Sequence, residues 1–196
     1  ISTDPCQKAK PAASLRRPEC VTLARTHREM PDWKSVRRQC VEDDILMLRF
    51  ESSRKRISSE LIKRLENLTE GELNTLATTD ASRLQTALLW VGICRTYEFV
   101  ADFAEQGIAE RWHSGKHDLP VGAYETFFEE AALVHPEVSK LTESTRERMR
   151  NQLFQMLREA GMLNRTNELL PLLLPAGVTE LLGTRELAFF PTRVQV

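Results

Sequence analysis

The sequence predicts a mostly α-helical protein, in which an N-terminal helical bundle is followed by a winged helix-turn-helix domain with a short β-ribbon. Apolar residues recur at helical spacing through most of the chain. The last third places a helix, a proline turn, a short helix, a longer helix and two short apolar segments in that order. We expect a poorly structured arm over residues 1–20, the bundle over 21–117 and the winged-helix domain over 118–196.

The first elements follow from periodicity and from helix-start signals. Residues 1–18 are rich in proline, alanine and lysine and show no hydrophobic period, which is typical of an arm. Pro31–Asp32 begins a predicted helix, and residues 52–68 repeat apolar side chains at the same period among basic ones. Thr69 with Glu72 three positions later is a capping box, which predicts a short helix.

The middle of the chain predicts the buried centre. Thr79 or Asp80 is expected to cap a helix whose residues 84–94 are almost all apolar, so this helix should lie inside the protein. Helical spacing continues over residues 97–112. The polar segment 113–120 interrupts it, and we place the domain boundary there.

Three helices are predicted in the last third. The first covers residues 121–134, and the second covers 136–141 with proline at its first position. The third begins where Ser144 and Glu147 stand at capping-box spacing, and it ends before Gly161.

The remainder is expected to add the ribbon. Residues 162–163 and 167–174 are predicted as two short strands around a turn at 164–166. A short helix near 176–182 and a strand at 187–190 are expected to follow.

Charge is distributed unevenly, although the net charge is only -1. Residues 1–40 carry nine basic and four acidic side chains, whereas residues 67–140 carry five basic and twelve acidic ones. Residues 141–166 return to five arginines and three glutamates. A polyanion responds to the local charge because screening acts over roughly 10 Å at ordinary salt. Nucleic-acid binding is therefore compatible with this composition if it is local.

The cysteines and the hydropathy indicate a soluble protein of a reducing, cytoplasmic compartment. The four cysteines are far apart and form no Cys-x-x-Cys pair. No signal peptide is visible, and the longest nearly apolar runs, 87–94 and 169–175, are shorter than the ~20 residues that span a bilayer. We expect no membrane partner.

No catalytic constellation stands out. His113 and His117 are four residues apart, but Gly115 between them argues against the helix that a metal site at this spacing needs. The adjacent carboxylates Asp43–Asp44 and Glu129–Glu130 diverge by about 100° on a helix and cannot act as a pair. We expect no enzyme activity, no metal, no cofactor and no small-molecule substrate.

The start of the third helix carries the residue types that contact duplex DNA. In a winged helix this helix enters the major groove. Hydroxyls and helix N-termini bind phosphates, arginine pairs with phosphate or guanine, and asparagine reads adenine. Arg146 and Arg150 lie opposite the apolar stripe and are expected to point outward, with Arg165 at the wing tip. The candidate DNA-binding residues here are Thr142, Ser144, Thr145, Arg146, Arg148, Arg150, Asn151 and Arg165.

A second basic group lies in the predicted bundle. Its candidate DNA-binding residues are Arg37, Arg38, Arg54 and Lys55, next to Arg56. Three consecutive basic residues cannot share one helix face. At least one of them is therefore expected to pair with Asp43, Asp44 or Glu60.

Two other interpretations fit the same pattern. Alternating arginine and glutamate on a helix is also typical of a solvated, self-paired surface, and Glu143, Glu147 and Glu159 could neutralise part of it. Winged helices also serve as protein-docking modules.

Residues 119–163 resemble the BrxA family of BREX bacteriophage-exclusion systems. The stretch HPEVSKLTESTRERMRNQLFQMLREAGML has that family's order of proline turn, Ser-Thr-Arg, long helix and Glu-Ala-Gly-apolar end. The resemblance extends more loosely over residues 30–190. It implies a helical N-terminal bundle joined to a winged helix, in an accessory protein without enzymatic activity. The duplex DNA binding associated with the family would fall on Ser144, Thr145, Arg146 and Arg150.

We therefore expect a double-stranded DNA-binding accessory factor of bacterial phage defence that contacts mainly phosphates. A protein-docking adaptor for other phage-defence proteins is the first alternative, because the middle of the chain is acidic and the C-terminal segment is hydrophobic. A helical RNA-binding protein is the second.

Overall fold

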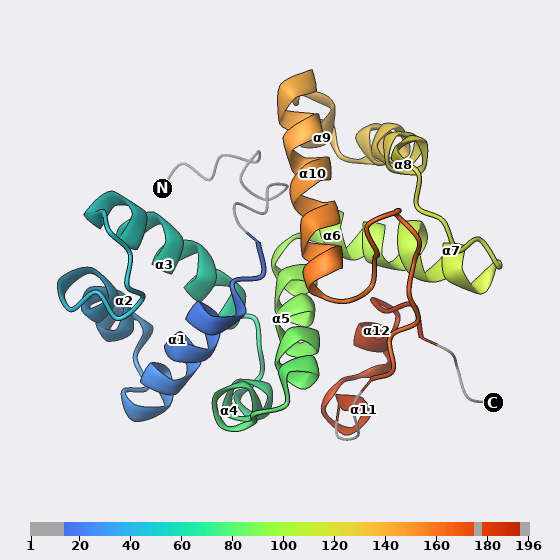
Figure 1. Ribbon diagram of the computed structural model, residues 1–196. Helices are drawn as coiled ribbons and strands as arrows, with labels where there is room; N and C mark the ends of the chain where they lie inside the picture. The colour runs from blue at the N-terminus through green and yellow to red at the C-terminus, as the bar shows by residue number, and fades with distance from the viewer. Residues whose placement is uncertain (1–13, 175–177, 193–196) are drawn as a thin grey trace.

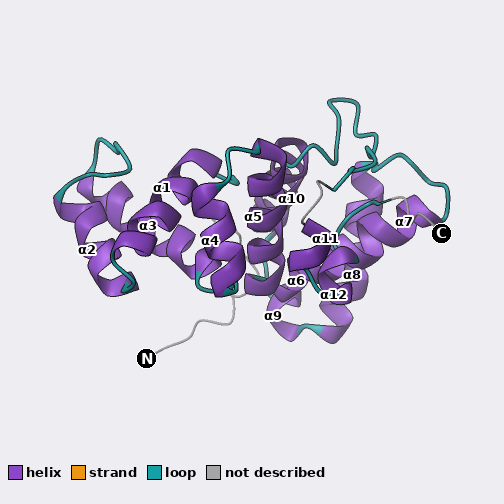
Figure 2. Cartoon of the chain, turned by 90° about the horizontal axis from the view of Figure 1, so that it is seen from below, coloured by secondary structure: helices purple, strands orange, loops and turns teal. Residues whose placement is uncertain are grey.

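The computed structural model describes residues 14–174 and 178–192 of the chain, which form an elongated assembly of helices (Figures 1 and 2). One end consists of α1 (Arg17–Glu29), α2 (Trp33–Glu42), α3 (Glu51–Leu65) and α4 (Glu70–Thr78). The centre consists of α5 (Ser82–Thr96) and α10 (Glu143–Glu159). The other end consists of α6 (Glu98–Asp102), the π-helical turn η2 (Phe103–Ala109), α7 (Glu110–His113), α8 (Val121–Val134), α9 (Pro136–Ser139), α11 (Val178–Leu181) and α12 (Thr184–Leu187).

The helix starts agree with the sequence at α4 and differ at α5 and α10. Thr69 and Glu72 form the predicted capping box at α4, with reciprocal side-chain-to-backbone hydrogen bonds. At α5, in contrast, the helix begins at Ser82 and the N-cap is Ala81, whose side chain makes no capping bond. The predicted cap at Thr79 or Asp80 is therefore wrong.

The predicted arm ends earlier than residue 20. Helix α1 begins at Arg17, so residues 17–20 are helical rather than poorly structured. Pro18 provides the fixed φ that suits a first helical turn, and Cys20 and Leu23 already face the core. Residues 1–13 of the predicted arm lie outside the described residues.

The core is organised around α5. All its residues from Ala87 to Cys94 are buried, as the apolar run predicts. Gly92 faces α3 so closely that a Cβ atom there would lie 2.9 Å from the carbonyl oxygen of Arg64. Buried side chains from Leu15 to Phe190 form one connected hydrophobic cluster, so both ends of the described chain contribute to the same core.

The predicted helix over residues 97–112 is divided into α6, η2 and α7. The middle part has π-helical hydrogen bonding, and Gly107 lies against the ring of Phe103, where a Cβ would be 2.6 Å from ring carbons. A glycine is therefore required at this approach. After α7, residues 117–119 run beside residues 167–169, with Leu119 N donating to Asn167 O at 2.7 Å.

The predicted β-ribbon is much shorter than expected. In residues 14–174 and 178–192, β-structure is limited to the bridges Asp118–Glu168 and Leu163–Leu169. Pro171 has no N–H to donate, so a ladder beyond Leu170 loses a hydrogen bond.

The strand predicted at 187–190 is wrong. α12 ends at Leu187, and both Phe189 and Phe190 are buried. Two consecutive residues of a strand would point to opposite faces. The turn after α12 instead turns both rings inward, and the backbone oxygen of Phe189 accepts a hydrogen bond from Trp90 Nε1 at 3.0 Å.

The mostly helical class is thus confirmed. Every helix in the described part of the chain falls short of the length and apolar character that crossing a bilayer requires.

Candidate nucleic-acid interface

Aromatic packing positions α8 against the helices that precede it. Phe127 of α8 contacts Phe99 and Phe103 with ring centroids 5.4 and 5.0 Å apart. Tyr124 meets Phe154 of α10 edge to face at 6.3 Å. The apolar side of α10 therefore faces the core, and the orientation of its polar residues is fixed by that packing.

The sequence predicts that Arg146 and Arg150 point outward, and this prediction is wrong. Both contact Glu125 of α8: Arg146 through Nε, and Arg150 through Nη1 at 2.8 Å. Arg146 also donates to the backbone oxygen of Glu125 at 3.1 Å and lies over the ring of Phe128, 4.4 Å from its centroid. The apolar side of α10 packs towards α8. Arg146 and Arg150 lie at the edge of that side, so their side chains meet α8 instead of solvent.

The outward side of α10 is formed by other residues. Ser144, Arg148, Asn151 and Gln155 are all exposed and recur at spacings of four, three and four residues. These spacings place them on one helix face. Within the described residues Arg148 and Asn151 make no side-chain hydrogen bond or ion pair. We call this group the outer stripe; it extends roughly 16 Å along the helix at 1.5 Å per residue.

Gln155 is the member that the sequence interpretation missed. The polar spacing that links it to Arg148 and Asn151 was present in the sequence. Glutamine is a weaker indicator of phosphate binding than arginine, because it carries no charge.

The N-terminus of α10 is not capped by a side chain. Its N-cap residue is Thr142 rather than Ser144, and the predicted capping box with Glu147 does not form. The Thr142 hydroxyl donates to Thr145 Oγ1 at 3.0 Å and lies 3.2 Å from Ser144 Oγ. Three hydroxyls and the first-turn N–H groups therefore gather at this end, an arrangement that suits an anion.

The chain after α10 turns back tightly. Gly161 takes a left-handed φ of 74° and ends the helix, as the sequence predicts. Arg158 Nη2 donates to Asn167 Oδ1 at 2.6 Å, and Asn164 Oδ1 accepts from two backbone N–H groups of the same turn. Arg165 is exposed on this turn with no ion pair to another described residue.

The four candidates in the N-terminal part are held differently. Arg37 and Arg38 are exposed on α2. Arg54 pairs with Asp44 at 3.2 Å, which agrees with the expectation that one of the consecutive basic residues has a carboxylate partner. Lys55 pairs with Glu51 at 2.5 Å on the surface of α3.

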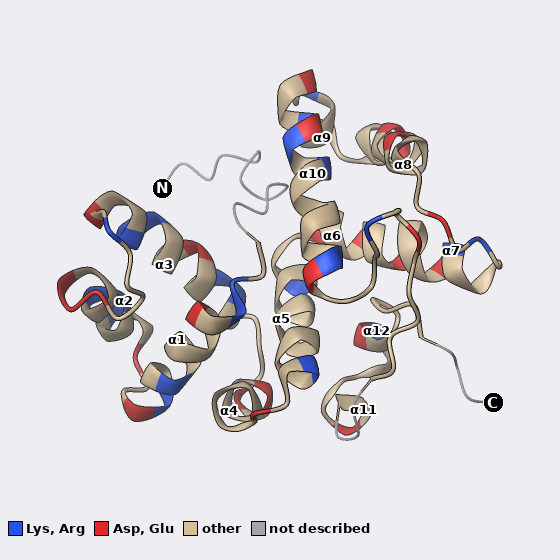
Figure 3. Cartoon of the chain, in the orientation of Figure 1, with Lys and Arg blue, Asp and Glu red and all other residues tan. Residues whose placement is uncertain are grey.

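The two groups of candidates lie on separate elements. Figure 3 shows basic segments along α3 and along α10, both toward the upper side in that view. Acidic segments are prominent on α6, α7 and α8 at the other end of the molecule. The charge asymmetry of the sequence is thus also an asymmetry in space.

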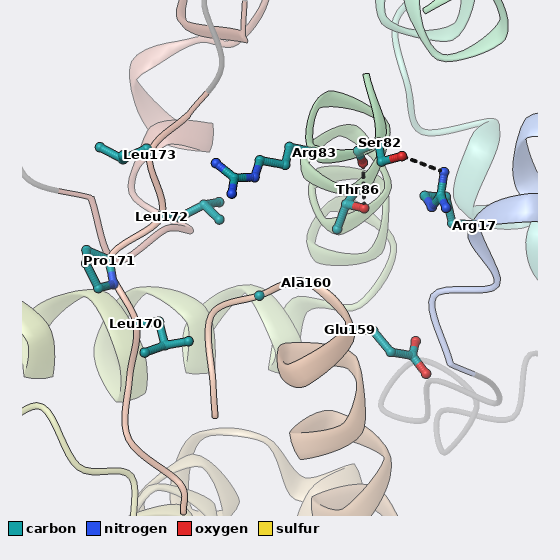
Figure 4. A pocket seen from close by; sticks show the side chains of 11 residues that line it. Arg17, Ser82, Arg83, Thr86, Glu159, Ala160, Leu170, Pro171, Leu172 and Leu173 are labelled. Carbon is teal, nitrogen blue, oxygen red and sulfur yellow. Dashed lines mark hydrogen bonds between the residues drawn. The ribbon is translucent and has the colours of Figure 1, made fainter. Parts of the chain in front are cut away.

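A cavity of about 580 Å³ lies between the two ends of the molecule, where α1, α5 and the end of α10 meet residues 170–173 (Figure 4). Arg17 and Arg83 line one side, and leucines line the other. Arg17 Nη1 donates to Gln85 Oε1 at 2.8 Å and to Ser82 Oγ at 3.2 Å. No local sequence signal could have found this cavity because its walls come from three parts of the chain that are far apart in sequence: Arg17, residues 82–86 and residues 159–173.

The thiols of Cys20, Cys40 and Cys94 are buried. Burial raises the pKa of Cys20 to about 12 and that of Cys40 to about 11. No three histidine, cysteine or acidic side chains of residues 14–174 and 178–192 gather as metal ligands. His113 instead lies 3.2 Å from the backbone oxygen of Thr192.

Comparison with known proteins gives the family. The BrxA family model matches residues 11–186. The BREX protein BrxA of Escherichia coli O9:H4 (strain HS) is 26% identical over 134 residues; the match covers 68% of this chain and 62% of that protein.

A solved structure shows a similar fold. An uncharacterized protein from Magnetospirillum magneticum superposes with a TM-score of 0.75 at 18% identity, covering 88% of this chain and 90% of the other. That likeness concerns the fold alone. The family match, which extends over most of the chain, agrees with the resemblance seen in the sequence, and the chain belongs to the BrxA family.

Proposed function

We propose that this chain binds duplex DNA, mainly through phosphates, as a non-enzymatic accessory factor of a bacterial phage-defence system. The observation that carries the proposal is the outer stripe of α10. An arginine, an asparagine, a glutamine and a serine share one exposed helix face, and Arg148 and Asn151 have no partner in the described chain. Arg148 and Asn151 can therefore meet a ligand without breaking a side-chain contact between described residues.

The surroundings of the stripe support a phosphate ligand. The uncapped N-terminus of α10 presents N–H groups and hydroxyls, which bind phosphate in helix N-terminal sites. Arg165 on the turn after α10 would reach a neighbouring phosphate of the DNA backbone. Phosphate contacts supply most of the affinity of such complexes and depend steeply on salt.

The order of elements supports a winged helix-turn-helix. α8, α9 and α10 follow one another, and the turn closed by the Leu163–Leu169 bridge stands where a wing would be. Residues 117–119 pair with that turn as an additional short segment. In this interpretation α10 is the helix that enters the major groove.

The relatives support the setting. The curated relative is named as a BREX protein, and we extend that role in phage exclusion to this chain. The extension is part of the proposal because the match spans 62% of that relative's length.

The test is binding to a labelled duplex by fluorescence anisotropy. The variant Arg148→Glu with Arg165→Glu should bind at least about tenfold more weakly, because it loses two phosphate contacts and gains two repulsions. Substituting Arg146 and Arg150 would be a poor test, since new carboxylates beside Glu125 would disturb the packing of α8 on α10.

The matched control is Lys116→Glu with Arg83→Glu. Both residues are exposed and lie off α10, on the loop after α7 and on α5, and this double variant changes the net charge by the same amount. Equal losses in the two variants would reduce the effect to net charge. Unchanged affinity in the α10 variant would place the DNA contact elsewhere, and failure of the unmodified protein to bind duplex would reject the proposal.

A protein-docking role is the second candidate, and one observation favours it. Leu133 and Val134 at the end of α8 are 87% and 75% exposed, next to the exposed carboxylates Glu129 and Glu130. Exposed apolar side chains of this size are typical of interaction surfaces when they lie together. Co-purification of a defence protein after nuclease treatment, lost on Leu133→Ser, would support it.

The RNA-binding alternative is tested by competition. If unlabelled RNA displaces the labelled duplex better than unlabelled duplex DNA does, RNA is the preferred ligand.

A further inference from the structure

The loop between α2 and α3 exposes two large apolar side chains at the end of the molecule. Met47 is 91% exposed and Phe50 is 59% exposed. In the same loop, Leu46 is buried and Leu48 packs partly against the core. The other leucines of the loop therefore pack against the core, whereas Met47 and Phe50 are exposed to solvent.

This loop is held in one shape. Asp44 accepts a hydrogen bond from Leu48 N at 2.8 Å through Oδ1 and pairs with Arg54 at 3.2 Å through Oδ2. Met47 N donates to Asp44 O at 2.8 Å. Met47 and Asp44 both have left-handed φ, 53° and 50°, which costs conformational energy for residues other than glycine. These contacts hold the exposed Met47 in place before any ligand binds. We call the exposed side chains of Met47 and Phe50 the projection.

The segment that carries this projection has an excess of basic side chains, which favours a polyanion. Residues 33–56 contain seven basic and four acidic side chains, and the Arg54 and Lys55 ion pairs use two of each. The remaining cations are exposed and, within the described chain, have no ion pair: Lys34, Arg37, Arg38, Arg49 and Arg56. They outnumber the two exposed carboxylates that remain, Glu42 and Asp43. Arg49 lies over the ring of Phe50, 5.2 Å from its centroid.

We propose that Met47 and Phe50 form a wedge that inserts between base pairs of duplex DNA and kinks it, while the neighbouring cations hold the phosphates. Proteins that bend DNA insert phenylalanine or methionine side chains at a base step in this way. The proposal rests on the duplex binding proposed above. It adds a second contact, on α2, α3 and their loop, that deforms the duplex instead of only following it.

An anionic membrane would attract the same charges, but the apolar area favours DNA. Membrane binding grows with the apolar area that enters the bilayer. The loop offers two side chains, whereas the packing of Leu46 and Leu48 in the core removes the others. One or two side chains are enough for a base-step wedge.

The experiment uses the full chain and a duplex of about 20 base pairs with a dye at each end and 2-aminopurine at a central TA step. Binding should raise energy transfer between the dyes and raise 2-aminopurine fluorescence. The variant Met47→Ser with Phe50→Ser should lose both signals. A central mismatch prepays part of the unstacking cost, so the unmodified protein should bind such a duplex about tenfold more tightly than the matched one. The variant should lose this preference.

The matched control is Leu133→Ser with Leu173→Ser, which removes two apolar side chains that are 87% and 73% exposed elsewhere. This control should keep both fluorescence signals. Duplex binding without any fluorescence change, or with the same change in the wedge variant, overturns the wedge and leaves the proposed function intact. Absence of duplex binding overturns both. Binding to phosphatidylserine vesicles that depends on Met47 and Phe50, with no response from the duplex, assigns the projection to a membrane instead.

Discussion

On the side of α10 that faces α8, Arg146 and Arg150 share one carboxylate, Glu125, and Arg146 also covers the ring of Phe128. On the opposite side of the same helix, Arg148 is exposed and has no partner in the described chain. The three arginines lie within five positions of each other. Their roles therefore depend on helix register relative to α8, and residue type alone says little about which of them can meet a ligand.

α5 repeats this contrast. Arg95 binds both Glu72 of α4 and Glu186 of α12 with distances between 2.7 and 3.1 Å, so it joins three helices. Arg83, near the start of the same helix, is exposed and lines the cavity. Paired arginines hold this fold together, and exposed arginines are available for other contacts.

The largest effect is expected for Arg95→Ala. It leaves the fully buried carboxylate of Glu72 without its cation, which should lower the free energy of unfolding by about 3–5 kcal/mol. Urea unfolding followed by circular dichroism measures this. Arg83→Ala on the same helix is the control and should stay within about 0.5 kcal/mol. Similar values for the two variants would contradict the division.

A smaller loss of stability should separate the two sides of α10. Arg146→Ala removes the contacts with Glu125 and Phe128 and should cost about 1–2 kcal/mol. Arg148→Ala should stay within about 0.5 kcal/mol. The same unfolding measurement compares them, and a more destabilising Arg148→Ala would show that the exposed arginine has a structural role.

Salt dependence should show the opposite order. If Arg148 contacts a phosphate, Arg148→Ala lowers the slope of log affinity against log salt by about 1. Arg146→Ala should leave the slope unchanged, because in the unmodified protein the Arg146 guanidinium is engaged by Glu125 and is not expected to contact a phosphate. Titrations of the duplex at several salt concentrations test both variants, and equal slopes for all three proteins would remove Arg148 from the interface.

The smallest effect concerns pH and Glu186. Burial alone would raise the pKa of Glu186, but a backbone hydrogen bond and the contact with Arg95 outweigh it and hold the pKa below the ordinary 4.5. A carboxyl with a lowered pKa stabilises the fold above its unfolded pKa, and this contribution is lost as the pH falls through the folded pKa. In the Glu186→Gln variant, the free energy of unfolding should therefore decrease less as the pH is lowered than it does in the unmodified protein. Identical acid-unfolding curves would contradict the role of this pair.

Local signals predicted much of the fold. The capping box at Thr69 and Glu72, the bounds of α8 and the stop at Gly161 depend on neighbours in sequence, and all three are confirmed. The contacts of Glu125 with Arg146 and Arg150 were not predictable, since they join residues 21 and 25 positions apart across two helices. The division of the chain at residue 118 stays a prediction.

The hydrogen bond between Trp90 and Phe189 has a consequence for how the chain is made. Its two residues are 99 positions apart, and Phe189 and Phe190 complete the apolar surroundings of α5. At 5–20 residues per second, a ribosome needs roughly 5–20 s to synthesise the chain between them. Until translation reaches α12, α5 lacks these last partners, so the apolar surroundings of this helix are incomplete in the nascent chain.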